Sequence, residues 1–291
     1  MATVNAREIL KSATQEKYAV GAFNITNIIQ LEGVVEAHEE MSAPLIIQTS
    51  VTPSKFLGQD VLVSVYHAIA ENSNIPICLH LDHCRDVDYC ISCADKGWTN
   101  IMIDASRMPF KENVSQTKEV VDYCHSNGDI TVEGELGTVS GVEDQVQVAE
   151  DASQLCDPEQ ALVFLEETGL DLLAPAIGTA HGVYKTKSPK VDFERFQKIS
   201  ELINGNKVRA PLVVHGGTGL PADYVTRLVA LGGAKFNVST DLKRTWIDAT
   251  YEYISAARDE YNPGKLDAHV KEAIKNKVKS WIKILGSAGK A

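Results

Sequence analysis

The stretch ICLHLDHC, residues 77–84, shows how this chain is built. Its first part is apolar almost without interruption, which is typical of a strand buried in a parallel sheet. His80, Asp82 and His83 then crowd its end, and such titratable side chains are costly to bury unless a partner compensates them. A strand that crosses a core and exposes its carboxyl end in a polar site would explain both the apolar beginning and the polar end of this stretch.

Seven other runs share this apolar character and alternate with amphipathic, helix-like stretches. With residues 77–83, the runs are VGAFNI (20–25), APLIIQTS (43–50), ICLHLDH (77–83), NIMIDAS (100–106), ITVEGELG (130–137), LLAPAIGTAHG (172–182), APLVVHGG (210–217) and KFNVST (235–240). The helix-like stretches include 54–72, 111–126, 157–168 and 221–231. Strands covered by helices in this alternating order are typical of α/β proteins.

Eight units of this kind predict an α/β fold, a TIM (β/α)8 barrel that forms a single domain over residues 1–291. Residues 265–284 are expected to add an extra C-terminal helix. The alternative, a doubly wound sheet, usually has fewer units and a G-x-G-x-x-G after its first strand, which this chain lacks. The polar stretch 137–154 is predicted to be a mobile active-site loop, because long loops in compact domains are often functional.

The composition restricts the function and the compartment. The net charge of −11 disfavours nucleic-acid binding, and no run of about 18 apolar residues predicts a membrane span. The N-terminus has no signal pattern and there are six cysteines, so we expect a cytoplasmic protein in a reducing compartment. Cys90 and Cys93 form a C-x-x-C pair in a helix-like stretch without a second pair, which favours plain helix packing.

Polar side chains collect where the predicted strands end, and in a TIM barrel these ends form the active site. They are Asn24, Ser50, Asp82, His83, Asp104, Glu133, Glu135, His181, His215, Asn237, Ser239 and Thr240. Three histidines from different elements are a known arrangement for a catalytic zinc ion with an open position. His83, His181 and His215 therefore predict a metal site, although each alone would be an ordinary hydrogen-bonded histidine.

The other five histidines are not expected to bind the metal. His80 alternates with Asp82 along its strand and is expected to be structural or to support the ligands. The remaining four lie on predicted helices, where solvated faces explain them most simply: His38, His67, His125 and His269.

Two glycine-rich turns follow two of these histidines, AHGVYK (180–185) and HGGTG (215–219). Glycines let backbone N–H groups approach a phosphate, and the helix expected after Gly219 would add its N-terminus. Together with NVST at the eighth strand, they predict an anion pocket at the usual barrel location. A metal, a neighbouring carboxylate and this pocket fit carbon–carbon bond cleavage in a phosphorylated keto-sugar, and they equally fit metal-assisted hydrolysis.

The motifs HLDHC, VEGELG, GTAHGVYK, VVHGGTGLP and KFNVSTDLK, in this order, resemble the class II, zinc-dependent ketose-bisphosphate aldolases. The likeness runs from VGAFNITN to GSAGKA. It implies that His83, His181 and His215 hold zinc, that Glu135 can visit the metal, and that Asp104 could contribute to a second metal site. Asp82 matches the acid/base that exchanges a proton with the C4 oxygen, and Glu143, in SGVEDQ, matches the loop glutamate that exchanges the C3 proton of dihydroxyacetone phosphate.

The resemblance also implies a substrate pocket, a second cation and a partner subunit. Matching substrate residues are Asn24, Ser50, Gly182, Lys185, Gly216, Gly217, Thr218, Asn237, Ser239, Thr240 and Lys243. Carbonyls near Ala180, Gly182 and Gly216 match a monovalent cation site, Na⁺ or K⁺, of some members. Lys243 matches a basic residue that reaches the substrate of a neighbouring subunit, so the resemblance implies a homodimer or homotetramer.

Three departures bear on the substrate. The resemblance implies cleavage of a tagatose- or fructose-type ketose 1,6-bisphosphate to dihydroxyacetone phosphate and an aldehyde such as glyceraldehyde 3-phosphate. Ser239 stands where fructose-specific members have Asp, which disfavours strict specificity for fructose. Val142 precedes the loop glutamate, and Gly264 replaces an Arg of the tail. These differences leave open another phosphorylated substrate, such as 5-dehydro-2-deoxygluconate phosphate. A non-catalytic sugar-phosphate-binding subunit is a separate alternative, which the intact Asp82, Glu143 and three histidines disfavour.

Overall fold

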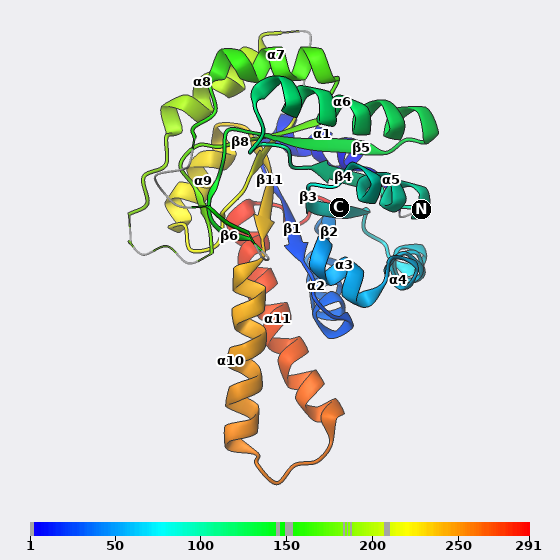
Figure 1. The fold of residues 1–291 in the computed structure, drawn as a ribbon. Coiled ribbons are helices and arrows are strands. Elements are labelled where there is room, and N and C mark those ends of the chain that lie inside the picture. Colours follow the sequence, from blue (N-terminus) through cyan, green and yellow to red (C-terminus); the bar gives the residue numbers. More distant parts are fainter. Residues whose placement is uncertain are drawn as a thin grey trace.

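Eight parallel strands close into a barrel in the order β1-β11-β10-β8-β5-β4-β3-β2, which confirms the predicted TIM barrel (Figure 1). The structure, a computed structural model, describes residues 3–143, 146–148, 154–182, 184, 186, 188–206 and 210–291, with only the backbone at 142–143 and 146–148. The barrel strands are β1 (Val20–Asn24), β2 (Leu45–Ser50), β3 (Ile77–Cys84), β4 (Asn100–Ile103), β5 (Thr131–Leu136), β8 (Leu172–Pro175), β10 (Leu212–Val214) and β11 (Gly233–Val238).

Helices cover the outside of the barrel and one of its ends. They are α1 (Ala6–Glu16), α2 (Ile28–Glu40), α3 (Val51–Leu57), α4 (Gln59–Asn72), α5 (Val87–Lys96), α6 (Phe110–Asn127), α7 (Pro158–Thr168), α8 (Phe193–Asn204), α9 (Ala222–Ala230), α10 (Thr240–Ala256) and α11 (Pro263–Leu285). The stretch 54–72, predicted as one helix, is divided at Gly58 into α3 and α4. Cys90 and Cys93 are both buried on α5, which agrees with packing rather than a redox motif.

Helix α1 closes the amino-terminal end of the barrel. Its Ile9 and Leu10 belong to one apolar cluster with residues from the barrel interior, among them Val20, Ile46 and Val213. The apolar part of each strand therefore lies in the barrel wall and floor, as the sequence of β3 indicated. Because the floor is closed by side chains, polar groups at the carboxyl ends can gather around one opening only.

A second, three-stranded sheet lies above the barrel and was not predicted. The polar stretch 137–154 contains a hairpin of β6 (Ser140–Glu143) and β7 (Val146–Val148). Strand β6 pairs in parallel with the short β9 (Ala180–His181), so Gly141 lies opposite His181. Gly141 has φ +104°, and a Cβ there would lie 2.2 Å from the carbonyl oxygen of His181, so only glycine allows this close approach. The sixth barrel strand thus ends at Pro175, and His181 lies on this second sheet instead.

Helices α10 and the first half of α11 project from the barrel as an arm (Figure 1). Helix α11 as a whole is the predicted extra C-terminal helix, and from Lys271 onward it packs on α2, where Lys271 and Lys275 form ion pairs with Glu36. At the base of the arm, Trp281 Nε1 donates to Asp241 Oδ2 at 2.9 Å. In the described part of the chain, no helix has both the length and the apolar character that a membrane span requires.

The prediction of a solvated face for His38 is wrong. Its ring is fully buried, and it lies edge-on to Phe23 with the ring centroids 5.1 Å apart. His38 continues the buried stripe of Leu31, Val34 and Val35, which follows the helical spacing of i, i+3 and i+4. The stripe was present in the sequence, and His38 should have been assigned to it.

Burial gives His38 a measurable effect on stability. It lowers the pKa of His38 to about 4, although the ring Nδ1 lies 2.8 Å from the Val34 carbonyl oxygen. An unfolded histidine titrates near 6.5, so the unfolded chain takes up a proton before the folded one does as the pH falls. We expect the wild type to lose up to about 3 kcal/mol more free energy of unfolding than His38→Met between pH 7 and pH 4. Urea unfolding of both proteins across this range measures the difference, and equal pH slopes would contradict the prediction.

Candidate active site

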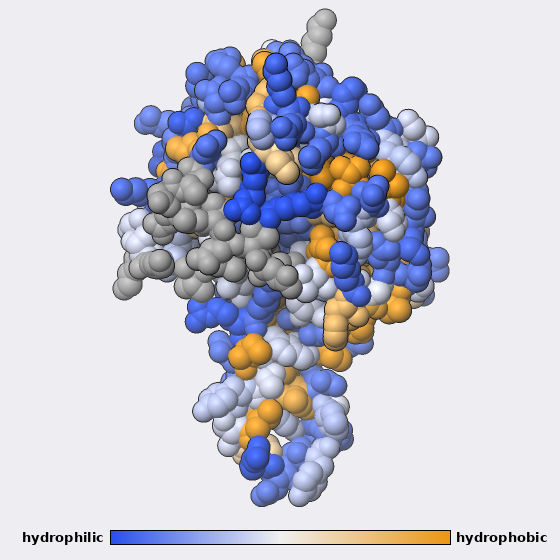
Figure 2. Space-filling view, viewed as in Figure 1, coloured by the Kyte–Doolittle hydropathy of each residue, from blue (hydrophilic) through white to orange (hydrophobic). Residues whose placement is uncertain are grey.

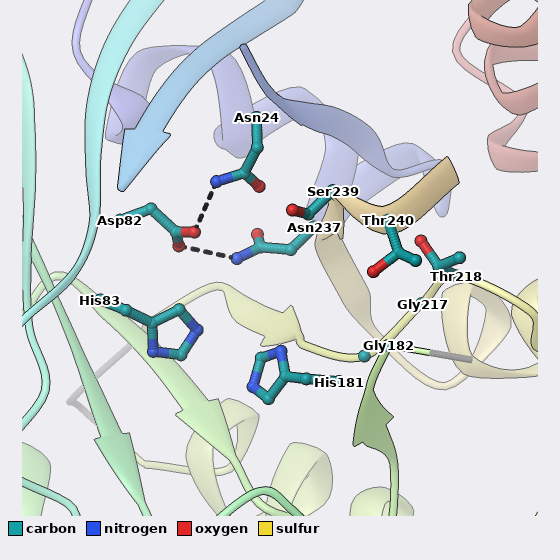
Figure 3. Close-up of a pocket in the computed structure, with 11 residues that line it drawn as sticks. Asn24, Asp82, His83, His181, Gly182, Gly217, Thr218, Asn237, Ser239 and Thr240 are labelled. Atoms are coloured by element: carbon teal, nitrogen blue, oxygen red, sulfur yellow. Dashed lines mark hydrogen bonds between the residues drawn. The ribbon is translucent and has the colours of Figure 1, made fainter. Parts of the chain in front are cut away.

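Strand β3 changes its geometry where it reaches the opening of the barrel. Adjacent strand residues normally point to opposite faces, so Asp82 and His83 could share a site only if the strand bends there. His83 has φ +45°, and the register between β3 and β4 shifts between Leu81 and Cys84. Such a bulge re-aims a side chain. Both Asp82 and His83 consequently line the same pocket (Figure 3).

The Asp82 carboxylate is buried and held from two sides. Asn24 Nδ2 donates to Asp82 Oδ2 at 2.8 Å, and Asn237 Nδ2 donates to Oδ1 at 3.0 Å. Asn24 itself accepts from Gln48 Nε2, which fixes the orientation of its amide. Two neutral donors satisfy one lone pair on each carboxylate oxygen and leave others facing the pocket, so Asp82 is in position to exchange a proton there.

Three histidines and one glutamate converge beside Asp82. The donor atoms of His83, Glu135, His181 and His215 all lie within 4.8 Å of one another. The ring centroid of His83 lies 4.9 Å from that of His181 and 4.6 Å from that of His215. Imidazole nitrogens and a carboxylate oxygen are the donors that zinc prefers. The structure therefore brings together the ligands that the sequence predicted.

One ring nitrogen of His83, a predicted ligand, has no hydrogen-bond partner among the described residues. His83 Nδ1 lies 3.1 Å from Asp104 Oδ2, while the buried Nε2 of the same ring has no hydrogen-bond partner among the described residues. A histidine that shares one nitrogen with a carboxylate and presents the other to a cavity has the usual arrangement of a metal ligand. This orphaned nitrogen and the chemistry of the donor set fit a divalent metal ion.

Asp104 does not belong to the four-residue donor group, but it contacts one member of that group, His83. Its carboxylate also accepts from Ser106 Oγ at 2.7 Å and from Arg85 at 3.4 Å. Burial alone would raise the pKa of Asp104, but the bonds from His83 and Ser106 and the charge of Arg85 lower it below its usual range. Asp104 is thus placed to orient His83, and its part in a second metal site stays a prediction.

His215 lies between two carboxylates. Its Nδ1 is 2.9 Å from Glu135 Oε2, and its Nε2 is 3.0 Å from Glu133 Oε1. Burial would lower the pKa of His215, but Glu133 and Glu135 raise it. The surroundings therefore favour positive charge on this side of the cluster, whether a proton or a metal ion carries it.

Lys235, which was not predicted to belong to the site, lies fully buried in the barrel interior on β11. Its ammonium donates to Glu133 Oε2 at 2.8 Å and to Asn237 Oδ1 at 2.9 Å, and it lies 3.3 Å from His80 Nε2. Burial alone would raise the pKa of Glu133, but Lys235 and the neighbouring histidines lower it. Burial and Lys235 lower the pKa of His80, so His80 is neutral and supports the network as predicted. Alternation along KFNV could have found Lys235, because it shares a strand face with Asn237.

A pocket opens above this network and includes about 270 Å³ of empty space, counting its mouth. Beyond Asp82 and the predicted ligands His83 and His181, its described lining consists of Asn24, Gly182, Gly216, Gly217, Thr218, Asn237, Ser239 and Thr240. Ser239 and Thr240 form the start of α10, so this helix presents its N-terminus to the pocket (Figure 3). No described residue of α9, the helix after Gly219, lines this pocket, so the expected contribution of its N-terminus stays a prediction. Backbone N–H groups at such a helix end favour an anion.

The remaining predicted site residues either do not line this pocket or lie wholly or partly outside the described residues. Ser50 ends β2 opposite Asp82 in register, but it does not line the pocket. Lys243 lies in the first turns of α10. Glu143 belongs to β6 by its backbone, while its side chain and all of Lys185 lie outside the described residues. The carbonyl oxygen of Gly216 accepts from Tyr184, and the monovalent cation stays a prediction.

Comparison with known proteins agrees with this geometry. Residues 4–290 match the family described as Fructose-bisphosphate aldolase class-II. The fructose-bisphosphate aldolase of Geobacillus stearothermophilus is 38% identical over all of this chain and 99% of its own, and that of Thermus caldophilus is 37% identical over 99% of both. The crystal structure of the YdjI aldolase from Escherichia coli K12 superposes with a TM-score of 0.86 at 31% identity, covering 99% of both chains. A putative fructose-1,6-bisphosphate aldolase from Coccidioides immitis gives 0.88 at 28% identity, over 98% of this chain and 97% of its own.

Proposed function

Since the chain belongs to the class II fructose-bisphosphate aldolase family and is a carbon–carbon lyase, we propose that it cleaves a ketose 1,6-bisphosphate with the help of zinc. The products would be dihydroxyacetone phosphate and an aldehyde such as glyceraldehyde 3-phosphate. The single observation that supports this proposal best is the meeting of three histidines, one of them with an orphaned nitrogen, beside the buried carboxylate of Asp82.

His83, His181 and His215 would hold the zinc ion, and Glu135 would act as a ligand in an alternate position. The bound ion would polarise the substrate carbonyl and stabilise the negative charge that develops on it. Asp104 and Glu133 would hold two of the rings in the orientation that ligation needs, since each contacts a histidine nitrogen.

Asp82 would take the proton of the C4 hydroxyl during cleavage and return it during condensation. The amides of Asn24 and Asn237 support this role because they fix the carboxylate without adding charge beside it. Glu143 on β6 would exchange the C3 proton of dihydroxyacetone phosphate. The pairing of β6 with β9 supports this second role because it attaches the loop strand to the strand that carries His181.

The substrate phosphate next to the reacting carbons would lie among the glycine-rich turns and the N-terminus of α10. Gly182, Gly216, Gly217, Thr218 and Thr240 line that side of the pocket. With a net charge of −11 on the chain, an anionic substrate needs such local donors. We also propose a cytoplasmic location, which six unpaired, buried cysteines support.

Ser239 supports a tagatose-type substrate over a fructose-type one. Its buried hydroxyl lines the pocket and has no hydrogen-bond partner among the described residues, so it is available to a substrate hydroxyl. Release of triose phosphate should be fastest from tagatose 1,6-bisphosphate when fructose 1,6-bisphosphate and 5-dehydro-2-deoxygluconate phosphate are compared. Ser239→Asp should move the preference towards fructose by about tenfold, the effect of a hydrogen bond worth about 1.4 kcal/mol, whereas Ser239→Ala should not. Release from none of the three would contradict the proposed function.

The arm supports a homodimer or homotetramer. Four large apolar or aromatic side chains on it are exposed: Ile247, Tyr251, Ile254 and Tyr261. Figure 2 shows apolar residues on the arm, away from the barrel. A second copy of the chain would cover them, because a two-fold interface buries the same patch on both subunits. Lys243, at the base of the same helix, would then lie near the neighbouring subunit's substrate.

Charge on the arm should therefore change the assembly. We expect Ile247→Lys combined with Tyr251→Lys to shift the mass measured by light scattering from an oligomer to the monomer of 31.7 kDa, because burying added ammonium groups in an apolar interface is costly. Val163→Lys is a matched control, since Val163 is also an exposed apolar residue but lies on α7, on the barrel. A wild-type protein that is monomeric, or an arm variant that remains oligomeric, would refute the predicted interface.

A further inference from the structure

Two of the three histidine-bearing turns touch each other through their backbones. Ala180 precedes His181, and Gly216 follows His215. Gly216 has φ +67°, and a Cβ placed on it would lie 2.5 Å from the Ala180 carbonyl oxygen and 2.8 Å from the Ala180 nitrogen. The two turns are therefore in close contact at the residues next to two ligands, and the distance between the turns sets the distance between the ligands.

One side chain joins the same two residues by hydrogen bonds. The hydroxyl of Tyr184 accepts from the backbone N–H of Ala180 at 2.9 Å and donates to the carbonyl oxygen of Gly216 at 2.8 Å. Burial raises the pKa of Tyr184 to about 12, so the hydroxyl keeps the proton that it donates. A Cβ on Gly219 would lie 3.3 Å from the Tyr184 ring, so the ring also lies against the end of the HGGTG turn.

We propose that Tyr184 is a positioning residue, which holds the His181 turn against the His215 turn and so retains the metal ion in the site proposed above. Tyr184 is not among the residues that line the pocket, and it would act only through the backbone next to the two ligands. The other side of the His181 turn is already fixed by its pairing with β6. Loss of the hydroxyl would free the turn on the His215 side only, so the two ligands would separate without unfolding the barrel.

Tyr184→Phe tests this proposal because it removes one oxygen and keeps the ring. The protein is loaded with zinc, and metal release to a chromogenic chelator is followed in the absence of substrate. We expect release to become about tenfold faster, the lower end of the effect of residues that orient metal ligands. With cobalt in place of zinc, the visible absorption spectrum should differ from that of the wild type, because it reports ligand geometry directly.

Tyr66→Phe is the matched control. Tyr66 is buried, and its hydroxyl donates to the carbonyl oxygen of Ile77 at 2.9 Å, at the start of the strand that carries His83. This variant loses a similar bond to a ligand-bearing element at the opposite end of the barrel. It should lower the thermal unfolding midpoint but release metal at the wild-type rate.

Two results would overturn the proposal. In the first, Tyr184→Phe has the metal-release rate and cobalt spectrum of the wild type. In the second, Tyr66→Phe accelerates release as much as Tyr184→Phe does, which would show general loosening of the barrel. The release experiment uses no substrate, so absence of aldolase activity in the wild type would contradict the proposed function while leaving this test intact.

Discussion

Removing the metal ion with a chelator should lower aldol cleavage by at least about 10³-fold, because several kcal/mol of transition-state stabilisation would be lost. The described pocket lining includes no Lys or Arg that could balance the charge developing on the substrate carbonyl. Steady-state assays before and after dialysis against chelator measure the loss, and added zinc should restore the activity. Unfolding of the metal-free protein, followed in parallel, separates loss of chemistry from loss of structure.

A second reagent distinguishes this reaction from Schiff-base chemistry. The buried amine of Lys235 is bonded to Glu133 and Asn237, and Lys235 is not among the described residues that line the pocket. Borohydride added during turnover should therefore trap no covalent adduct with the substrate. Full activity after complete metal removal, or a trapped adduct by mass spectrometry, would show that the metal-dependent mechanism is wrong.

Asp82→Ala should keep the metal and lower turnover by about 10²–10⁴, the usual contribution of a general acid or base. The reason is that Asp82 is the carboxylate that both faces the pocket and is held by Asn24 and Asn237, while it is not part of the donor group. Metal content by elemental analysis and kcat for cleavage are the two measurements.

Asp86→Ala is the control for this variant. Asp86 is only four residues away, but its side chain caps α5 by accepting from the Tyr89 N–H at 3.2 Å. Its loss should cost about 1 kcal/mol of stability, the typical value for a helix cap, with turnover unchanged. A normal kcat in Asp82→Ala would remove the role assigned to that carboxylate.

The barrel could be predicted because buried parallel strands have a signature in the local sequence. The runs at 20–25, 43–50 and 77–83 each begin with a nearly continuous apolar stretch, and each overlaps an observed strand. His83 and His215 could be assigned to strand ends for the same reason. His181 could not, because its strand exists only through pairing with β6, about forty residues earlier in the chain.

Features that depend on tertiary contacts were beyond the sequence. The bend at His83 follows from the pairing of β3 with β4, so nothing within HLDHC could show its positive φ. Alternation places Lys235 on the same strand face as Asn237, but its ion pair could not be predicted, because only closure of the barrel brings Glu133 within 2.8 Å of its amine. The position of the α10 N-terminus at the pocket likewise depends on a tertiary feature, the direction in which the chain leaves β11 and enters α10.

The buried ammonium of Lys235 has a consequence for the energetics of turnover. A hydrogen-bond network of fixed dipoles and charges lies beneath the pocket and consists of Lys235, Glu133, His80 and Asn237. Without this network, water would have to solvate the charges of the site. Water must rotate when charge moves between substrate and protein, and that rotation costs free energy in every cycle. The groups of this network are oriented when the chain folds and do not rotate during turnover. The free energy of orienting them is therefore spent during folding and not in each catalytic cycle.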